Sequence, residues 1–165
     1  MACDALLGCR VGPGRSYLEG MTKPQAAAVK PRAAESKPHE RLKAWSACHE
    51  LVVAVYRETA GWPESETHGL AAQARAVAFS AALNLAEGSA KPGMREFRRC
   101  LDVALGSLGE LACILVIARD IGVMDGSAFG EVEVLRDHAS RLTKGLDRAL
   151  QRRMTPRELA ASSYS

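Results

Sequence analysis

The sequence predicts an all-α protein, an up-down-up-down antiparallel four-helix bundle that assembles as a homo-oligomer. Aromatic residues make up only 5% of the 165 residues, whereas Ala and Leu are abundant, and this composition favours helices over sheets. Four long segments repeat apolar residues at intervals of three and four, with short turn-forming segments between them, which indicates an antiparallel bundle. The two middle segments are apolar around their whole circumference and need cover on more than one side. They therefore predict a subunit interface.

Residues 1–39 precede the first of these segments and show no sustained periodicity. They are rich in Pro, Gly, Ala and Lys, and we expect a disordered N-terminal tail. The formal net charge of +3 resides in this tail, because residues 40–153 balance their acidic and basic residues. A neutral folded part is not typical of a dedicated duplex-DNA-binding domain. Translation from Met1 and translation from Met21 are both compatible with the sequence.

The first predicted helix runs from about Glu40 to Thr59. Its apolar positions recur at intervals of three and four residues, which is the pattern of one buried stripe on an amphipathic helix. These positions are Leu42, Trp45, Cys48, Val52, Val55 and Thr59. Gly61, Trp62 and Pro63 follow directly and end the helix.

The second predicted helix begins near Ser65 or Thr67, either of which can cap its N-terminus, and ends at about Glu87. Gly88 is the predicted C-terminal stop. Arg75 is the only charged residue in the interior of this segment. A membrane span is the alternative for so apolar a segment, but its polar residues make it a poor one. We therefore expect no membrane association.

The third predicted helix runs from about Met94 to Ile121, after a turn at residues 91–93. Its inner face consists of Phe97, Leu101, Leu105, Leu108, Ala112 and Leu115. The stretch LACILVIA, residues 111–118, is apolar on every side. This stretch is too short to span a membrane, so it adds to the prediction of a subunit interface.

The fourth predicted helix runs from about Ala128 to Arg152, after a break at residues 122–127. Its inner face consists of Phe129, Val132, Leu135, Ala139, Leu142, Leu146 and Leu150. Basic residues in the last turn and Pro156 just beyond it are typical end signals. The bundle domain thus covers residues 40–153, and we expect residues 154–165 to form a flexible C-terminal tail.

A stripe of polar residues interrupts the apolar second helix at intervals that place them on one side of it. Two polar residues of the third helix have a matching spacing, within a glycine-containing stretch that another backbone can approach closely. The six residues are Gln73, Ser80, Asn84, Glu87, Ser107 and Glu110. Buried polar groups require hydrogen-bond partners. We therefore predict a polar seam that fixes how helices or subunits meet.

The same residues do not make a convincing catalytic site. Glu87 and Glu110 are two carboxylates of the kind that perform acid–base chemistry or hold a metal. However, a bundle di-iron site requires Glu-x-x-His motifs, and none of the four histidines has Glu three residues before it. Neither a G-x-S-x-G motif nor a glycine-rich phosphate loop after a strand is present.

The cysteines provide no framework for a metal site or for disulfides. The chain has five, an odd and scattered set without a C-x-x-C pair, which fits a reducing cytoplasm. We expect a cytoplasmic protein that is not an enzyme. We also expect it to bind no metal, cofactor or small-molecule substrate.

Basic residues gather at the start of the third helix and along one face of the fourth. The candidates for nucleic-acid contact are Arg95, Arg98, Arg99, Arg141, Lys144, Arg148 and Arg152. Their spacing on the fourth helix fits contact with a phosphate backbone, although aromatic residues for base stacking are absent from this stretch. The alternative is an ordinary solvated face, because Asp137 and Asp147 lie among them.

Several short motifs follow one another in a fixed order. They are L-x-x-W from Leu42, P-x-x-E-x-x-G-L-x-x-Q from Pro63, S-x-x-x-N-x-A-E-G from Ser80, E-F at Glu96, and A-x-G-S-x-x-E from Ala104. Together they resemble the four-helix bundle family of bacterial 23S ribosomal RNA intervening sequences. The resemblance spans about residues 42–150. The N-x-A-E-G motif followed by A-x-G-S-x-x-E is a fairly specific combination.

The resemblance implies a homopentamer without known catalytic residues. The family includes the accessory variability proteins of diversity-generating retroelements, which partner a reverse transcriptase and nucleic acid through a basic surface. One position departs from the family pattern. The family has an arginine three residues after the glutamine, whereas this chain has Ala76, with Arg75 one position earlier. A shift by one residue turns a side chain by about 100° around a helix, so the role of that arginine is not carried over.

These observations favour a non-enzymatic oligomeric scaffold that docks on ribosomal or other structured RNA. The alternative is a protein–protein adaptor, such as a reverse-transcriptase accessory subunit, without direct nucleic-acid contact. The expected partners are further copies of the chain, in a pentamer, and an RNA or a nucleoprotein. Salt dependence of RNA binding separates the two hypotheses, because affinity that depends on phosphate contacts falls as salt rises.

Overall fold

The computed structural model describes residues 37–66 and 68–154, and all regular secondary structure in this part of the chain is helical. The long helices are α1 (Lys43–Thr59), α2 (Leu70–Ala90), α3 (Met94–Asp120) and α4 (Gly126–Arg153). Two 3₁₀ turns, η1 (Pro38–Arg41) and η2 (Glu64–Glu66), precede α1 and α2. The prediction of an all-α protein with four long helices is therefore confirmed. The two predicted tails lie almost entirely outside the described residues.

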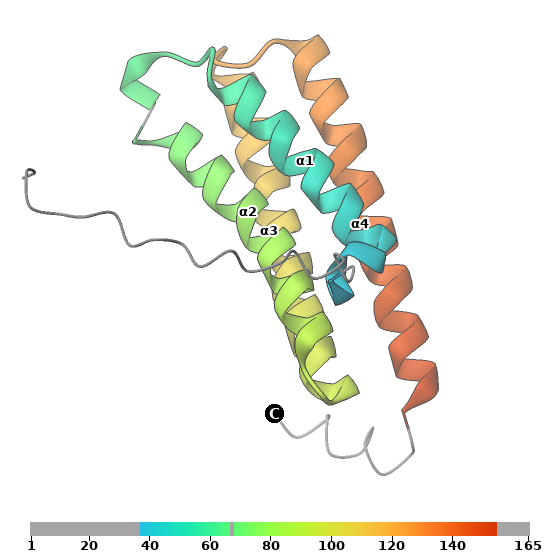
Figure 1. The fold of residues 1–165 in the computed structure, drawn as a ribbon. Helices are drawn as coiled ribbons and strands as arrows, with labels where there is room; N and C mark the ends of the chain where they lie inside the picture. The colour runs from blue at the N-terminus through green and yellow to red at the C-terminus, as the bar shows by residue number, and fades with distance from the viewer. Residues whose placement is uncertain (1–36, 67, 155–165) are drawn as a thin grey trace, which may run out of the picture. The chain divides into compact units, whose positions relative to one another are not determined.

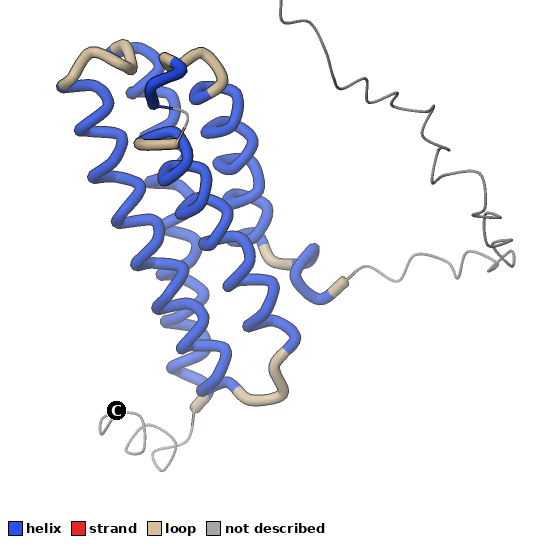
Figure 2. Tube along the Cα trace, turned by 90° about the vertical axis from the view of Figure 1, so that its left-hand side faces the viewer, coloured by secondary structure: helices blue, strands red, loops and turns tan. Residues whose placement is uncertain are grey.

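The four long helices lie side by side around one core (Figure 1). Each helix contacts the next along the chain, and α4 also contacts α1, so the packing closes on itself. The most extensive contact is between α2 and α3. Figure 2 shows the same four helices from the side, joined by short connections.

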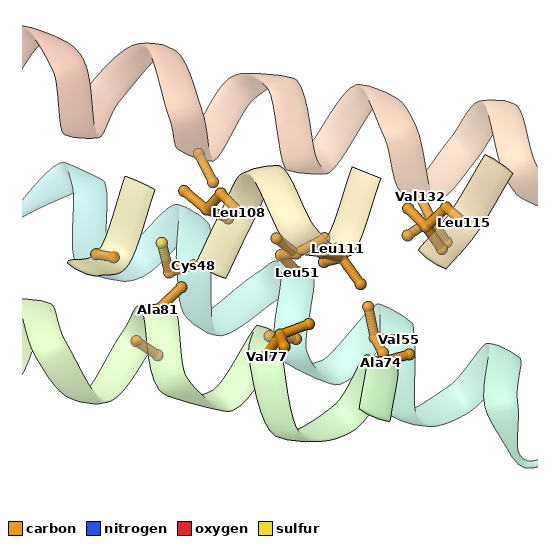
Figure 3. Packing of buried hydrophobic residues seen from close by; sticks show 14 of the residues in the cluster. Cys48, Leu51, Val55, Ala74, Val77, Ala81, Leu108, Leu111, Leu115 and Val132 are labelled. Carbon is orange, nitrogen blue, oxygen red and sulfur yellow. The ribbon is translucent and has the colours of Figure 1, made fainter. Parts of the chain in front are cut away.

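The core between the helices is aliphatic (Figure 3). Leu51 of α1 and Leu108 and Leu111 of α3 are fully buried, and burial of one such side chain contributes about 1.5–3 kcal/mol. The contribution of α2 is different, because most of its buried residues are alanines, such as Ala74 and Ala81. These small side chains allow the backbone of α2 to lie close to its neighbours.

The helix α2 begins at Leu70, later than predicted. Ser65, a predicted cap, lies in the turn η2, and Thr67 lies outside the described residues. The backbone N–H of Leu70 instead donates a hydrogen bond to Oε2 of Glu66, at 3.2 Å. A carboxylate therefore supports the first turn of α2, where it also interacts favourably with the helix dipole.

The predicted stop at Gly88 is wrong, because α2 continues to Ala90. Gly88 is buried, and a Cβ atom built on it lies 2.9 Å from Cβ of Cys100 and closer still to the ring of Phe97. This glycine is needed where α2 and α3 approach each other closely. Sequence reasoning missed this because a helix-ending glycine and a close-contact glycine are the same residue type.

The helices α3 and α4 begin and end within two residues of the predicted bounds. The N-terminus of α4 has a cap that was not predicted. The Oδ1 atom of Asp125 accepts hydrogen bonds from the backbone N–H groups of Ser127, at 2.8 Å, and Ala128, at 2.9 Å. This cap accounts for the start of α4 at Gly126.

Among the described residues, α3 is the one helix long and apolar enough to cross a membrane by length and composition. Its residues Leu101, Leu108 and Leu115 are buried in the core, where α3 contacts α2 and α4. A core helix of a bundle can meet the same criteria as a membrane span, so length and composition alone do not identify one.

Candidate interaction surfaces

Three of the six predicted seam residues form a hydrogen-bond network between α2 and α3. The hydroxyl oxygens of Ser80 and Ser107 are 3.0 Å apart. Ser107 donates to the carbonyl oxygen of Val103, at 3.1 Å. Asn84 Nδ2 donates to the carbonyl oxygen and the hydroxyl oxygen of Ser80, at 2.9 and 3.3 Å. The hydrogen bonds can therefore form a chain in one direction, in which Asn84 donates to Ser80, Ser80 to Ser107, and Ser107 to the backbone. This chain satisfies the buried Ser107 hydroxyl.

The other three seam residues, Gln73, Glu87 and Glu110, are exposed. Glu87 forms an ion pair with Lys91, one turn further along, with Oε1 and Nζ 3.0 Å apart. The hydrogen bond from Lys91 to this carboxylate raises the pKa of Lys91. Within the described residues, no hydrogen bond or ion pair joins either Glu87 or Glu110 to the serine network. The two carboxylates therefore do not form a paired site within the chain.

Large apolar side chains of α2 and α3 are exposed to solvent, from Phe79 next to Ser80 to Ile121, about 21 Å along α3 from Ser107. Phe79, Leu83, Val103, Ile117 and Ile121 are 49%, 51%, 53%, 48% and 56% exposed. Their spacing places Phe79 and Leu83 on one side of α2, one turn apart. We call these five residues the α2/α3 outer face. Sequence reasoning expected an interface on these helices but did not name these residues, although their helical spacing was visible.

Glycines make the middle of α3 thin on its outer side. Gly106 and Gly109 are exposed, and a Cβ atom on either would meet nothing within 4 Å. Each glycine in a helix interior costs about 1 kcal/mol relative to alanine. Packing within the single chain does not explain either residue.

The three arginines predicted at the start of α3 have different environments. Arg98 is largely buried, and its Nε donates to Oδ1 of Asp147 on α4, at 2.7 Å. It therefore ties α3 to α4 and is not part of an exposed basic surface. Arg99 is well exposed, with Nη1 3.9 Å from the carboxylate of Glu96. Arg95 is half-buried in the first turn of α3.

The four basic residues predicted on α4 are all exposed and share one face of the helix. They are Arg141, Lys144, Arg148 and Arg152, which we call the α4 basic stripe. Arg141 forms an ion pair with Asp137, with Nη1 and Oδ2 2.9 Å apart. It is the only member of the stripe with an ion pair to another described residue. The other three cations therefore remain open to solvent or to a ligand.

Arg75 contacts α1. Its Nε donates to the hydroxyl oxygen of Thr59, at 2.7 Å. Its guanidinium carbon lies 5.4 Å from the ring centroid of Tyr56, within the range of a cation–π interaction. Thr59 is buried and donates in turn to the carbonyl oxygen of Val55, at 2.7 Å. Arg75 thus joins α2 to the end of α1.

Reactive side chains are scarce in the described part of the chain. Residues 37–66 and 68–154 contain no group of three or more His, Cys, Asp or Glu that could hold a metal ion. Burial raises the pKa of the Cys48 thiol to about 11, and the hydrogen bond with Thr143 acts weakly in the opposite direction. The thiol is therefore protonated at neutral pH and is a poor nucleophile.

A family model described as 23S rRNA-intervening sequence protein matches residues 40–145. The match runs from the turn before α1 into α4 and covers well over half of the chain. The chain belongs to this family. The resemblance based on the sequence motifs is confirmed. The 23S rRNA-intervening sequence protein family is not a known enzyme family, and its function is unknown. No curated protein matches the chain.

The family match covers the two surfaces to different extents. The serine network and the α2/α3 outer face fall entirely inside the matched residues. The α4 basic stripe extends past them, because Arg148 and Arg152 lie beyond residue 145. The family match therefore covers only the first half of the basic stripe.

Proposed function

We propose that this protein is a non-enzymatic cytoplasmic scaffold, an up-down-up-down bundle that assembles into a homo-oligomer through its α2/α3 outer face and docks on structured RNA through α4. The oligomer that we propose is a pentamer, as the family resemblance implies. The observation that carries the proposal is the set of five exposed large apolar side chains on two adjacent helices. Exposed apolar surface on soluble proteins often marks binding sites for other molecules.

Three features of the α2/α3 outer face support self-association. Its five large apolar residues would lose unfavourable contact with water on association. The exposed Gly106 and Gly109 leave room for a second backbone to approach α3 closely. Glu110 shares the side of α3 that carries Val103 and Ile117, and Gln73 is exposed on α2. Both are available for hydrogen bonds with another subunit, which fix the register of an interface.

The RNA part of the proposal rests on the α4 basic stripe. The stripe offers three cations that no described carboxylate pairs, each four residues from the next along one helix face. Successive cations of this kind lie about 6 Å apart along the helix axis, which suits contact with consecutive phosphates of one strand. Such contacts carry no sequence information, so they fit an RNA recognised by its shape.

Self-association is tested with Leu83→Glu and, as a control, Ala60→Glu at the exposed end of α1. Sedimentation velocity gives the mass of each variant, and circular dichroism confirms that both remain helical. We expect Leu83→Glu to reduce the assembly to smaller species, because it places a charge in an apolar contact, whereas Ala60→Glu leaves the mass unchanged. A wild-type chain that is monomeric at micromolar concentration refutes the proposed assembly.

RNA docking is tested with Lys144→Glu/Arg148→Glu against the matched control Lys43→Glu/Arg57→Glu on α1, where both residues are also exposed. The ligand is a structured fragment of ribosomal RNA, and fluorescence anisotropy is measured at several salt concentrations. We expect the α4 variant to weaken binding and to reduce the salt slope by about 0.7–0.9 for each lost phosphate contact. If wild-type protein does not bind, or if the two variants behave alike, RNA docking is refuted and the protein-adaptor alternative is favoured.

A further inference from the structure

The outer side of α4 contains glycines that its own chain does not require. Gly130 and Gly145 are exposed within the helix, and a Cβ atom on either would meet nothing within 4 Å. Each glycine weakens an exposed helix interior by about 1 kcal/mol relative to alanine. Between them lies Val134, whose exposure of 66% is the highest among the large apolar residues of the described chain. These residues belong to neither the α2/α3 outer face nor the α4 basic stripe.

A shallow apolar hollow, widely open to solvent, adjoins these residues on the surface of the N-terminal half of α4. The open space above its lining measures about 620 Å³. Its lining residues are Gly126, Ser127, Gly130, Glu131, Val134 and Leu135. Gly130 forms part of its floor, so the missing side chain contributes to the space. A small apolar side chain from another molecule would fit there.

The charges on the exposed side of α4 change sign along the helix. Glu131 is exposed in the N-terminal half, whereas Arg148 and Arg152 are exposed in the C-terminal half. Arg141 lies near the midpoint, where Asp137 of the same chain neutralises it. A helix with this distribution is electrostatically complementary to a second copy of itself in the opposite direction.

We propose that two copies of this chain pack α4 against α4 in antiparallel orientation about a two-fold axis. In such a pair, each residue lies at the height of the partner residue whose number, added to its own, gives a fixed total. A total of 279 fits the exposed valine, the exposed glycines and the change in charge along α4. Val134 faces the partner's Gly145, so the exposed side chain enters the space above a glycine. Glu131 faces the partner's Arg148.

The same register places Gly130 and the hollow at the height of the partner's Ala149, which is also exposed. Two small residues at one height allow the helices to approach closely. Because a two-fold interface is isologous, each of these contacts occurs twice. The interface consists of one helix pair, which is below the area of about 1,200 Å² typical of stable complexes. It therefore forms a weak, concentration-dependent contact between two copies or two assemblies.

Charge reversal tests the electrostatic part of the proposal. Glu131→Arg and Arg148→Glu each replace two attractive pairs by two repulsive pairs, and the double variant restores attraction with the signs exchanged. We expect each single variant to weaken pairing on the order of tenfold, and the double variant to recover it. Sedimentation in the Leu83→Glu background isolates this contact, because the expected α4-paired species there is a dimer. If the double variant is as weak as the single ones, the register is refuted.

Disulfide trapping tests the geometry. In the proposed pair, Cys introduced for both Val134 and Gly145 brings thiols of two copies together, so mild oxidation should give a covalent dimer on a non-reducing gel. Either single variant should not respond, because the two copies of one position lie about 16 Å apart along the axis, too far for a disulfide. The parent chain controls for its native cysteines. If the double variant shows no more dimer than the parent, or if a single variant cross-links equally well, the antiparallel pair is refuted.

The two experiments separate this contact from the proposed function. Failure of α4 pairing leaves the mass of the α2/α3 assembly unchanged. Arg148 belongs to both the α4 pair and the α4 basic stripe, so the disulfide test at Val134 and Gly145, which lie outside the stripe, is the one that separates pairing from RNA docking. Conversely, if the α2/α3 outer face does not associate, the wild-type chain still forms the α4-paired dimer at high concentration. A chain that stays monomeric up to several hundred micromolar refutes both.

Discussion

The hydroxyl oxygens of Ser80 on α2 and Ser107 on α3 lie 3.0 Å apart, 27 residues from each other in the sequence. Their hydrogen bond is one of the few polar contacts in an otherwise aliphatic helix pair. Asn84 supports it from the same helix as Ser80, and Ser107 continues it to the backbone of α3. The contact therefore fixes the axial position of α2 against α3, which apolar packing alone defines less sharply.

We expect Ser80→Ala and Ser107→Ala each to lower the free energy of unfolding by about 0.5–1.5 kcal/mol, the usual effect of losing one hydrogen bond. The double variant should lose less than the sum, with a coupling of about 0.5 kcal/mol or more, because both substitutions remove the same contact. Urea unfolding followed by circular dichroism measures the wild type, both single variants and the double variant. Additive losses would show that the two hydroxyls act independently.

The same network shows how far the sequence predicts the site. Helical spacing was sufficient to place Ser80, Asn84 and Ser107 on facing surfaces, because the period of a helix is fixed. Helical spacing alone does not show how far the buried contact between α2 and α3 extends around each helix. Glu87 and Glu110 were assigned to the seam with the others, yet both are exposed in the single chain.

The contact between α3 and α4 through Arg98 and Asp147 was not predicted. Arg98 and Asp147 are 49 residues apart and meet at 2.7 Å, but their pairing depends on the relative heights of α3 and α4. Those heights result from the packing of the whole core and leave no local pattern. The long helices themselves were predicted well, since three-and-four periodicity is a local property. Their ends were predicted less well where glycine or a hydroxyl residue permits more than one role.

Gly88→Ala should destabilise the protein by about 1–3 kcal/mol, because the added Cβ atom overlaps the Phe97 ring and crowds Cys100. Gly106→Ala is a matched control in the neighbouring helix, where the same atom meets nothing within 4 Å. In the Leu83→Glu background, which removes the effect of self-association, the control should gain up to about 1 kcal/mol from helix propensity. Thermal unfolding measures both. Equal shifts for the two variants would contradict the close approach at Gly88.

The stability of the protein should fall at alkaline pH through Cys48. Burial raises the pKa of this thiol to about 11 from a reference value of 9.0. The folded state thus holds the proton more tightly than the unfolded state. The associated stabilisation is complete below pH 9 and is lost as pH rises from about 9 to 11. It amounts to about 2–3 kcal/mol for a shift of this size.

The comparison of wild type with Cys48→Ala isolates this effect from the titration of Lys and Tyr residues. Urea unfolding at a series of pH values from 7 to 11 should show a steeper loss in the wild type than in the variant. Labelling provides a second measurement, since an alkylating reagent at neutral pH should modify the exposed Cys113 well before Cys48. Parallel pH profiles, or equal labelling rates, would contradict the raised pKa.

Arg75 should act in stability and not in RNA binding. Its Nε donates to Thr59 on α1, and its guanidinium lies over the ring of Tyr56. Arg75→Met keeps the apolar stem but removes the hydrogen bond and the cation, so we expect a loss of about 1–2 kcal/mol in the free energy of unfolding. Arg75→Lys should lose less, because it retains the charge near the ring. RNA affinity at a fixed salt concentration should be the same for both variants as for wild type. A weakened RNA affinity with unchanged stability would instead place Arg75 in the binding surface.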